Sequence, residues 1–265
     1  MIEKKLKDTA FISGNWPLKK DLPTLIFISG ASSCSTFWRV QIDELSKTFN
    51  TIAIDLPGHG RTLGNGEKKI ERYADAVKEF VEEIKPPVPV ICGFSMGGAI
   101  TLELLIKQRR LFEAGIIINS GASLKILPLI LKKIREKNKK EVNFENLFTE
   151  LAISEKSDPA KIIPLVAASS NSNTQVTIND IHACNTFNVK KELRDIDVPV
   201  LIMTSEDDIL TPAKNGHYLA ENIKGSKIIH IKNAGHLSPI EQPDEVNSAI
   251  LNFVTETFQY RALKN

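Results

Sequence analysis

The segment Gly93-Phe94-Ser95-Met96-Gly97 constrains the fold of this chain more than any other feature. It follows an apolar run at residues 88–92 and precedes a helix-like stretch that begins at Met96. Glycines two residues on either side of a serine leave room for close packing around a turn that strains the serine backbone. The hydroxyl then projects above a sheet at a helix N-terminus, where negative charge is favoured. The pattern predicts a strand–turn–helix unit that presents Ser95 as a nucleophile.

Strand-like and helix-like segments alternate along most of the chain. Strands are expected at residues 24–29, 51–54, 88–92, 115–119, 198–203 and 227–231, and helices near residues 37–47, 69–85, 96–109, 212–223 and 245–258. This alternation is typical of an α/β fold with a mostly parallel central sheet and helices on both faces. Residues 2–13 are expected to add an antiparallel hairpin at one edge of the sheet.

The alternation breaks between residues 122 and 194. Here helix-like periodicity recurs at residues 124–134, 144–151, 159–169 and 176–187, without a strand pattern between them. We interpret residues 122–194 as a helical lid inserted between two strands, and residues 1–121 and 195–265 as the core that carries the chemistry. Insertions on such scaffolds commonly select the substrate.

A nucleophilic serine needs a base, and the base needs a group that orients it. His236 lies in a loop directly after the strand expected at residues 227–231, and Asp207 and Asp208 follow the strand expected at residues 198–203. The carboxyl ends of strands are where open α/β sheets keep their functional groups. Successive residues that leave a strand point in different directions, so only one of the two aspartates can face the histidine.

These elements resemble those of the α/β-hydrolase superfamily, in the esterase-like branch that carries a helical lid. Five segments occur in the family's order: Ser29-Gly30-Ala31 after a strand, D-L-P-G-H-G-R-T at residues 55–62, the serine turn, the acid loop at residues 205–212, and Gly235-His236. Two positions depart from the family pattern, because Ser29 replaces a histidine and Ser205 a glycine. His59, in the second segment, is assigned only to a glycine-rich turn.

The resemblance implies a Ser-His-Asp triad of Ser95, His236 and an aspartate. The family's acid lies four residues before the proline of this loop, which selects Asp208 by counting back from Pro212. Asp207 is then expected to face solvent or cap the loop. The amides of Ala31 and Met96 are expected to form the oxyanion hole. The residues expected to bind the substrate are Gly30, Phe37 and Trp38. Core packing is the alternative for the two aromatic residues.

The implied activity is hydrolysis of a small carboxylic ester, thioester or lactone through an acyl-enzyme. Relatives that use an aspartate nucleophile are disfavoured by Ser95, and Leu237 replaces the lysine of hydroxynitrile lyases and the tryptophan of carbon–carbon bond hydrolases. A perhydrolase or acyltransferase with the same triad stays open. So does a function from another class, a non-catalytic homologue that binds a small molecule.

Composition bounds the remaining possibilities. The 265 residues are 42% hydrophobic, enough to bury a core without disulfides or metals, and the net charge of +2 gives no case for nucleic acid. The three cysteines lack C-x-x-C spacing, and no apolar run reaches the length of a membrane span. We expect no cofactor, no metal, a small-molecule acyl substrate and a cytoplasmic location, because the charged N-terminus lacks a signal-peptide pattern. A homodimer is left open.

Overall fold

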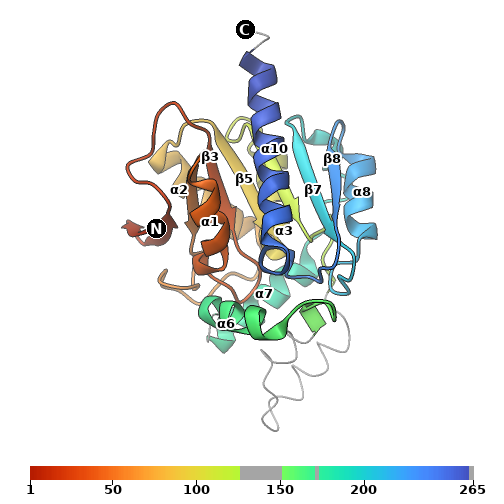
Figure 1. Cartoon of the computed structure of the whole chain (residues 1–265). Coiled ribbons are helices and arrows are strands. Elements are labelled where there is room, and N and C mark those ends of the chain that lie inside the picture. Colours follow the sequence, from red (N-terminus) through yellow and green to blue (C-terminus); the bar gives the residue numbers. More distant parts are fainter. Residues whose placement is uncertain (126–150, 171–172, 263–265) are drawn as a thin grey trace.

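One eight-stranded sheet runs through the molecule, with strand order β1-β2-β4-β3-β5-β6-β7-β8. The computed structural model describes residues 1–125, 151–170 and 173–262 (Figure 1). Strands β3 to β8 are parallel, whereas β1 and β2 pair antiparallel at one edge, so the expected sheet and hairpin are both confirmed. The strands are β1 (Ile2–Leu6), β2 (Thr9–Ser13), β3 (Thr24–Ile28), β4 (Asn50–Ile54), β5 (Pro89–Phe94), β6 (Ala114–Ile118), β7 (Val200–Ser205) and β8 (Lys227–Ile231).

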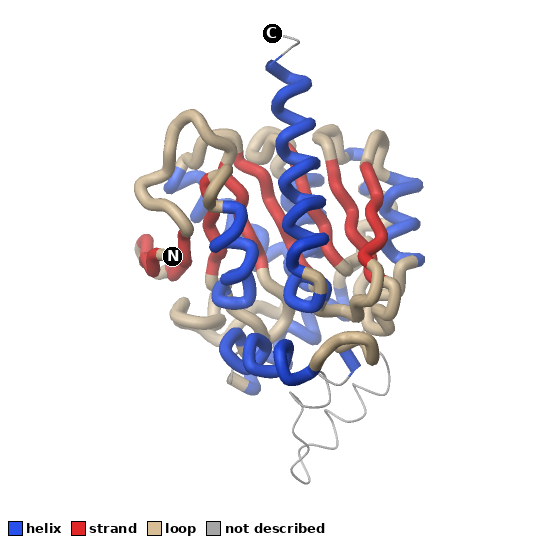
Figure 2. The backbone as a smooth tube through the Cα atoms, in the orientation of Figure 1, coloured by secondary structure: helices blue, strands red, loops and turns tan. Residues whose placement is uncertain are grey.

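Helices cover both faces of this sheet. Helices α1 and α10 pack together on one face, in front of the sheet in Figure 2, and α2 and α3 pack together on the other. The helical elements of the described residues are η1 (Ser35–Trp38), α1 (Arg39–Leu45), α2 (Ile70–Ile84), α3 (Met96–Lys107), α6 (Pro159–Ser169), α7 (Thr174–Thr186), η2 (Leu193–Asp195), α8 (Lys214–Asn222), α9 (Ser238–Glu241) and α10 (Pro243–Ala262).

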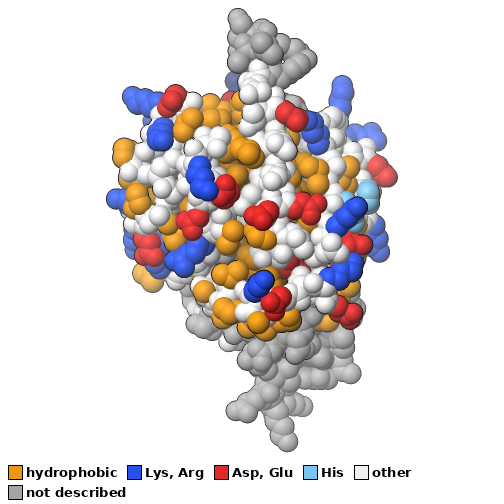
Figure 3. Space-filling model, viewed as in Figure 1, with side chains coloured by type: hydrophobic (Ala, Val, Ile, Leu, Met, Phe, Trp, Pro, Cys, Tyr) orange, Lys and Arg blue, Asp and Glu red, His pale blue; other side chains and the backbone are white. Residues whose placement is uncertain are grey.

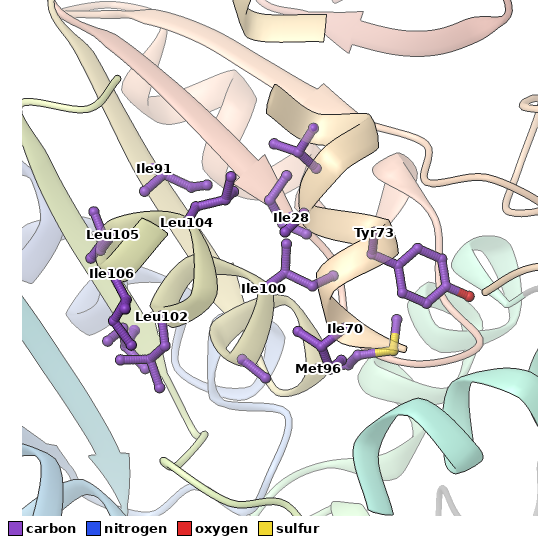
Figure 4. Packing of buried hydrophobic residues seen from close by; sticks show 14 of the residues in the cluster. Ile28, Ile70, Tyr73, Ile91, Met96, Ile100, Leu102, Leu104, Leu105 and Ile106 are labelled. Carbon is purple, nitrogen blue, oxygen red and sulfur yellow. The ribbon is translucent and has the colours of Figure 1, made fainter. Parts of the chain in front are cut away.

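The sheet separates two apolar cores, and β3 contributes to both. All five residues of β3 are buried, and successive side chains point to opposite faces of the sheet. Leu25 and Phe27 pack in the core beneath α1 and α10, whereas Ile26 and Ile28 pack toward α2 and α3. Figure 4 shows this second core, where side chains of α3 meet Ile28 and Ile91. Burial on both faces explains why the strand reads as a continuous apolar run.

The strand order reverses direction at β3, because β3 pairs with both β4 and β5. Ligand sites of open α/β sheets lie outside the carboxyl ends of the strands at such a reversal. Here the loop that begins at Ser29 and the turn at Ser95 leave the sheet side by side, since β3 and β5 pair in parallel register with Ile28 opposite Gly93. The topology therefore brings together two segments that are far apart in the sequence.

Two helices of the segment expected to form a lid are described, and both lie across the edge of the sheet where the parallel strands end (Figure 1). Helix α6 has the predicted bounds, and its start is set by Asp158, whose side chain accepts a hydrogen bond from Ala160, with proline at the first helical position. Helix α7 starts at Thr174 because Asn173 caps it. Two more helices are expected in this segment, at residues 124–134 and 144–151, and nearly all of both lies outside the described residues. Of the residues that are described, 124 and 125 are not helical, whereas 151 is.

Helix ends differ slightly from the sequence expectations. The helix expected at residues 37–47 begins as the short 3₁₀ element η1 at Ser35, and the last helix starts at Pro243 rather than residue 245. Pro243 suits the first helical position and acidic residues follow it, which favours that start. None of the helices in the described ranges is both long enough and apolar enough to cross a bilayer. On the face viewed in Figure 3, positive and negative side chains are interspersed.

The buried position of β3 predicts a large stability difference between two identical substitutions. Leu25 is 0% exposed and Leu63 is 80% exposed. Leu25→Ala leaves a cavity and should lower the free energy of unfolding by about 2–5 kcal/mol, whereas Leu63→Ala should change it by less than about 0.5 kcal/mol. Urea denaturation of both variants measures the difference. Equal losses would contradict the described packing of β3.

Candidate active site

Ser95 occupies a strained turn between β5 and α3. Its backbone has φ 54° and ψ −116°, a conformation that costs energy for any residue other than glycine. Hydrogen bonds hold it on both sides: the Ser95 amide donates to the carbonyl of Ile118 at 3.0 Å, and the Ser95 carbonyl accepts from the Ser120 hydroxyl at 2.8 Å. Ser95 as a whole is half-buried. The predicted turn is therefore present, and neighbouring strands stabilise it.

The two glycines of the turn are required by close backbone contacts. A Cβ atom on Gly93 would lie 2.0 Å from the carbonyl oxygen of Gly97, and one on Gly97 would lie 2.2 Å from the carbonyl oxygen of Ile28. Real Cβ atoms do not approach backbone oxygens so closely. The turn after β5 is thus wedged against the end of β3, which explains the spacing of the glycines around the serine.

Ser95, His236 and Asp208 form one chain of hydrogen-bonding contacts. His236 Nε2 lies 2.9 Å from Ser95 Oγ, and His236 Nδ1 lies 2.9 Å from Asp208 Oδ2. The imidazole and the carboxylate are both buried. The three residues leave β5, β7 and β8 at the same edge of the sheet, as the sequence analysis expects. Their catalytic roles are taken up below as a proposal.

The carboxylate of Asp208 is held by the loop that it begins. Its Oδ1 accepts the amides of Leu210 and Thr211 at 2.9 and 2.8 Å, and its Oδ2 accepts the Thr211 hydroxyl at 2.6 Å. Burial alone would raise the pKa of this carboxyl, but attraction to His236 and the hydrogen bonds from His236 and Thr211 outweigh burial and lower it. The side chain is therefore fixed and ionised next to the imidazole.

Asp207 differs from the expectation that it faces solvent or caps the loop. Its Oδ2 accepts the Ser154 hydroxyl at 2.6 Å and lies 3.4 Å from the ammonium of Lys156, and its side chain is only 32% exposed. Adjacent residues do point in different directions, as expected, but Asp207 points toward the segment that follows residue 150. It binds the inserted region, whereas Asp208 binds His236.

Two residues that the sequence analysis did not single out hold the histidine loop. The carboxylate of Glu241 accepts the amides of Gly235 and Leu237 at 3.0 and 2.9 Å, on either side of His236. The side-chain amide of Asn119, at the end of β6, donates to the carbonyl of His236 at 2.8 Å. A polar residue directly after an apolar strand was the available signal for Asn119. For Glu241 the sequence offers only its nearness to His236.

The amides expected at an oxyanion hole lie at the N-terminus of α3 and in the loop after β3. Met96 is the first residue of α3, so its N–H has no acceptor within the helix. Ala31 follows Gly30, and the chain here comes close to the serine, since a Cβ atom on Gly30 would lie 3.2 Å from Ser95 Cβ. The structure thus brings the loop after β3 against the serine turn.

The two aromatic residues expected near a substrate have different surroundings. The Phe37 ring stacks on Phe94 at 4.9 Å between centroids, and Phe94 in turn lies 4.9 Å from the His236 ring. Trp38 is fully buried and packs on Phe27 at 4.8 Å. The burial of Trp38 favours core packing, the alternative given for it above. Phe37 packs against Phe94, the ring that lies beside His236.

Other reactive side chains of the described residues are not arranged for metal binding. Within residues 1–125, 151–170 and 173–262, no group of three or more His, Cys, Asp or Glu side chains could hold a metal ion. The three cysteines are free thiols in buried positions. Burial raises the pKa of Cys34, Cys92 and Cys184, so these thiols are poor nucleophiles.

This chain is similar to one family of known proteins and to individual members named as hydrolases or esterases. A model of the Alpha/beta hydrolase family matches residues 25–249. A protein of Agrobacterium fabrum named "Putative carbamate hydrolase RutD" is 28% identical over 245 residues, which cover 88% of this chain and 94% of that protein. A pimeloyl-[acyl-carrier protein] methyl ester esterase of Nitrosospira multiformis is 24% identical over 249 residues, with 87% and 94% covered.

A solved structure supports the same fold. The enol-lactonase of Burkholderia xenovorans LB400 superimposes with a TM-score of 0.84 over 96% of this chain and 100% of that chain, at 18% sequence identity. At this identity the likeness shows the fold, with its mostly parallel sheet and flanking helices.

The lowered pKa of Asp208 predicts a specific pH dependence of stability. Its folded-state pKa lies below the ordinary value of about 3.9, so the ionised carboxylate stabilises the fold above that pH, and this contribution is lost as pH falls through the folded-state pKa. Urea denaturation between about pH 5 and pH 2 should therefore show a steeper loss for the native chain than for Asp208→Asn. An equal loss of stability with falling pH in the two proteins would contradict the lowered pKa of Asp208.

Proposed function

The chain belongs to the alpha/beta hydrolase family, and on that premise we propose that it is a serine hydrolase of a small carboxylic ester, thioester or lactone. The observation that carries this proposal is the contact chain from Asp208 through His236 to Ser95, with both contacts of His236 at 2.9 Å. The order Ser, Asp, His along the chain is the order used by this family. Ester hydrolysis is also supported by relatives named as esterases.

In the proposed reaction, Ser95 Oγ attacks the acyl carbon while His236 Nε2 takes its proton. The imidazolium then returns this proton to the leaving group, and an acyl-enzyme remains on Ser95. Water attacks that ester with His236 again as the base, which releases the acid and restores the serine. Asp208 holds the imidazole with Nδ1 protonated and stabilises its positive charge; its ionised, buried position supports this role.

The negative charge that develops on the acyl oxygen needs hydrogen-bond donors fixed in advance. We assign this role to the amides of Met96 and Ala31. The position of Met96 at the N-terminus of α3 and the close approach of the Gly30 loop to Ser95 support the assignment. The helix dipole of α3 adds to the stabilisation.

We also propose that residues 122–194 act as a lid on a core of residues 1–121 and 195–265. The support is the position of α6 and α7 across the strand ends (Figure 1). Within this segment the residues that approach the site include Ala152, whose carbonyl accepts the His236 amide at 2.6 Å. A lid in this position would choose the acyl group, and Phe37 with Gly30 would border the substrate from the core side.

A screen of short p-nitrophenyl esters, thioesters, lactones and carbamates tests the substrate class. Carbamates are included because of the name of one relative. Turnover that disappears in Ser95→Ala supports the hydrolase. Tight binding of a small molecule without turnover of any acyl compound would instead support the non-catalytic homologue, and transfer to an alcohol or to hydrogen peroxide would support the acyltransferase or perhydrolase.

If the three residues act as one unit, losses of activity should not multiply. Ser95→Ala and His236→Ala should each lower kcat by about 10⁴-fold or more, and the double variant should be scarcely worse than either single variant. Steady-state kinetics on one ester, with circular dichroism to confirm folding, measures this. A double variant whose loss equals the product of the two single losses would overturn the shared mechanism.

The neighbouring aspartates provide a matched pair of variants. Asp208→Asn should keep the shape of the loop but favour the wrong imidazole tautomer, with a loss of about 10⁴ in kcat if the protease precedent applies. Asp207→Asn should retain most of kcat, because Asp207 contacts Ser154 and Lys156 rather than His236. The same ester assay compares them. A crippled Asp207→Asn beside an active Asp208→Asn would reverse the assignment.

A further inference from the structure

Asp180, in α7, is a buried carboxylate that the proposed mechanism does not use. Its side chain is fully buried, and it accepts hydrogen bonds from three separate parts of the core. His59 Nε2 lies 2.9 Å from Oδ2, the amide of Ser32 donates to Oδ2 at 2.8 Å, and the Tyr73 hydroxyl donates to Oδ1. In Figure 4, Tyr73 stands at the edge of the apolar cluster with its hydroxyl pointing out of it.

Burial and Asp180 together set the pKa values of two of its hydrogen-bond partners, His59 and Tyr73. Burial alone would lower the pKa of His59, but the hydrogen bond and the charge of Asp180 outweigh burial and raise it, so the imidazole is a suitable donor. Burial together with Asp180 raises the pKa of Tyr73, which keeps that hydroxyl protonated as a second donor. Removing one of these buried side chains leaves its partners without a hydrogen bond, which lowers the stability of the fold.

The third donor connects this cluster to the reacting atoms. Ser32 follows Ala31, whose amide we assign to the oxyanion hole, and Ser32 has a backbone φ of 59°. A serine with positive φ is strained and keeps this conformation only when its surroundings impose it. Asp180 holds the Ser32 amide, and Thr177, one turn earlier on α7, holds the Ser32 hydroxyl with 2.8 Å between the two side-chain oxygens.

We propose that Asp180 is a positioning residue for the oxyanion hole: by binding the Ser32 amide, it fixes the loop after β3 so that the Ala31 amide faces the acyl oxygen. The inserted segment would then take part in the chemistry as well as in substrate choice. This inference rests on the proposed function. A purely structural role, in which Asp180 only attaches α7 to the core, is the alternative that the experiment must separate.

Helix α7 offers a matched control for that alternative. Asn179 precedes Asp180, is also buried, and donates a hydrogen bond to the carbonyl of Asn65 at 2.8 Å, so it too attaches α7 to the core. Asn179 has no contact with the loop after β3 in the hydrogen bonds of the described residues. Asn179→Ala therefore removes an attachment of α7 to the core and leaves the contact with Ser32 in place. Asp180→Ala removes an attachment of α7 and the contact with Ser32.

The experiment compares Asp180→Ala, Asp180→Asn and Asn179→Ala in kcat, in KM for a short ester, and in the Kd of butylboronic acid. This acid adds to a serine hydroxyl and forms a tetrahedral anion, so its affinity reports on the oxyanion hole. Asp180→Ala should lose about 10-fold to 100-fold in kcat with little change in KM, and should bind the boronic acid about tenfold or more weakly. Asp180→Asn keeps an oxygen that can accept the Ser32 amide. It should therefore retain most of the native kcat and most of the affinity for the boronic acid.

Asn179→Ala should keep kcat and boronic acid affinity within about twofold of the native chain, even where thermal denaturation shows a comparable loss of stability. Equal losses of kcat in Asn179→Ala and Asp180→Ala would overturn the proposal in favour of simple attachment. A folded Asp180→Ala with native kcat would overturn it as well. Ser95→Ala is measured alongside: if that variant keeps full turnover, the proposed function itself fails, which is a separate result.

Thr177→Val covers the case in which Asp180→Ala does not fold. This variant removes the hydroxyl contact to Ser32 on the partly exposed side of α7 and leaves the buried cluster intact. A loss of a few-fold in both kcat and boronic acid affinity, with unchanged melting temperature, is the expected result. Native values of both quantities in Thr177→Val would overturn the proposal.

Discussion

The close contact between the ends of β3 and β5 is the constraint on which the site depends. Gly97 lies so near the carbonyl of Ile28 that a side chain at this position is impossible, and Gly93 has the same restriction against Gly97. This contact forces the turn between β5 and α3 to be sharp, and Ser95 consequently takes a positive φ. The strain is sustained because all of β3 and all of β5 except Pro89 are buried, so the turn cannot relax without disturbing the sheet.

Buried polar groups do the remaining positioning around this turn. A buried carboxylate is costly unless several donors surround it, and each buried carboxylate at the strand ends has such donors. The buried Asp208 accepts from its own loop and faces His236, while the half-buried Glu241 accepts the amides that flank the histidine. Such groups favour a single geometry, because moving any one of them leaves polar partners without their hydrogen bonds. Loops at the edge of the sheet thereby gain the rigidity that apolar packing gives the strands.

The inserted segment is joined to these loops rather than simply resting on them. Ala152 accepts the amide of His236, Ser154 binds Asp207, and Asp180 reaches the loop after β3. Ala183 and Cys184 of α7 also pack into the core on the α2 and α3 side. The proposed division between a core for chemistry and an insertion for substrate choice is therefore less sharp in space than in the sequence, where it coincides with the end of the strand pattern.

The sequence by itself determined the sheet, the longer described helices to within a few residues of their ends, and the segments that meet at the edge of the sheet. Strand runs such as residues 24–28 are local patterns of burial, and the glycines around Ser95 and the N-cap of α6 are local requirements. Tertiary structure alone decided which polar residues meet across long sequence distances. His59 reads as part of a turn and Asp180 as one polar residue in a helix, yet they are in contact, 121 residues apart. A periodic pattern records which face of an element is buried, whereas the partner of a buried charge depends on how separate elements pack.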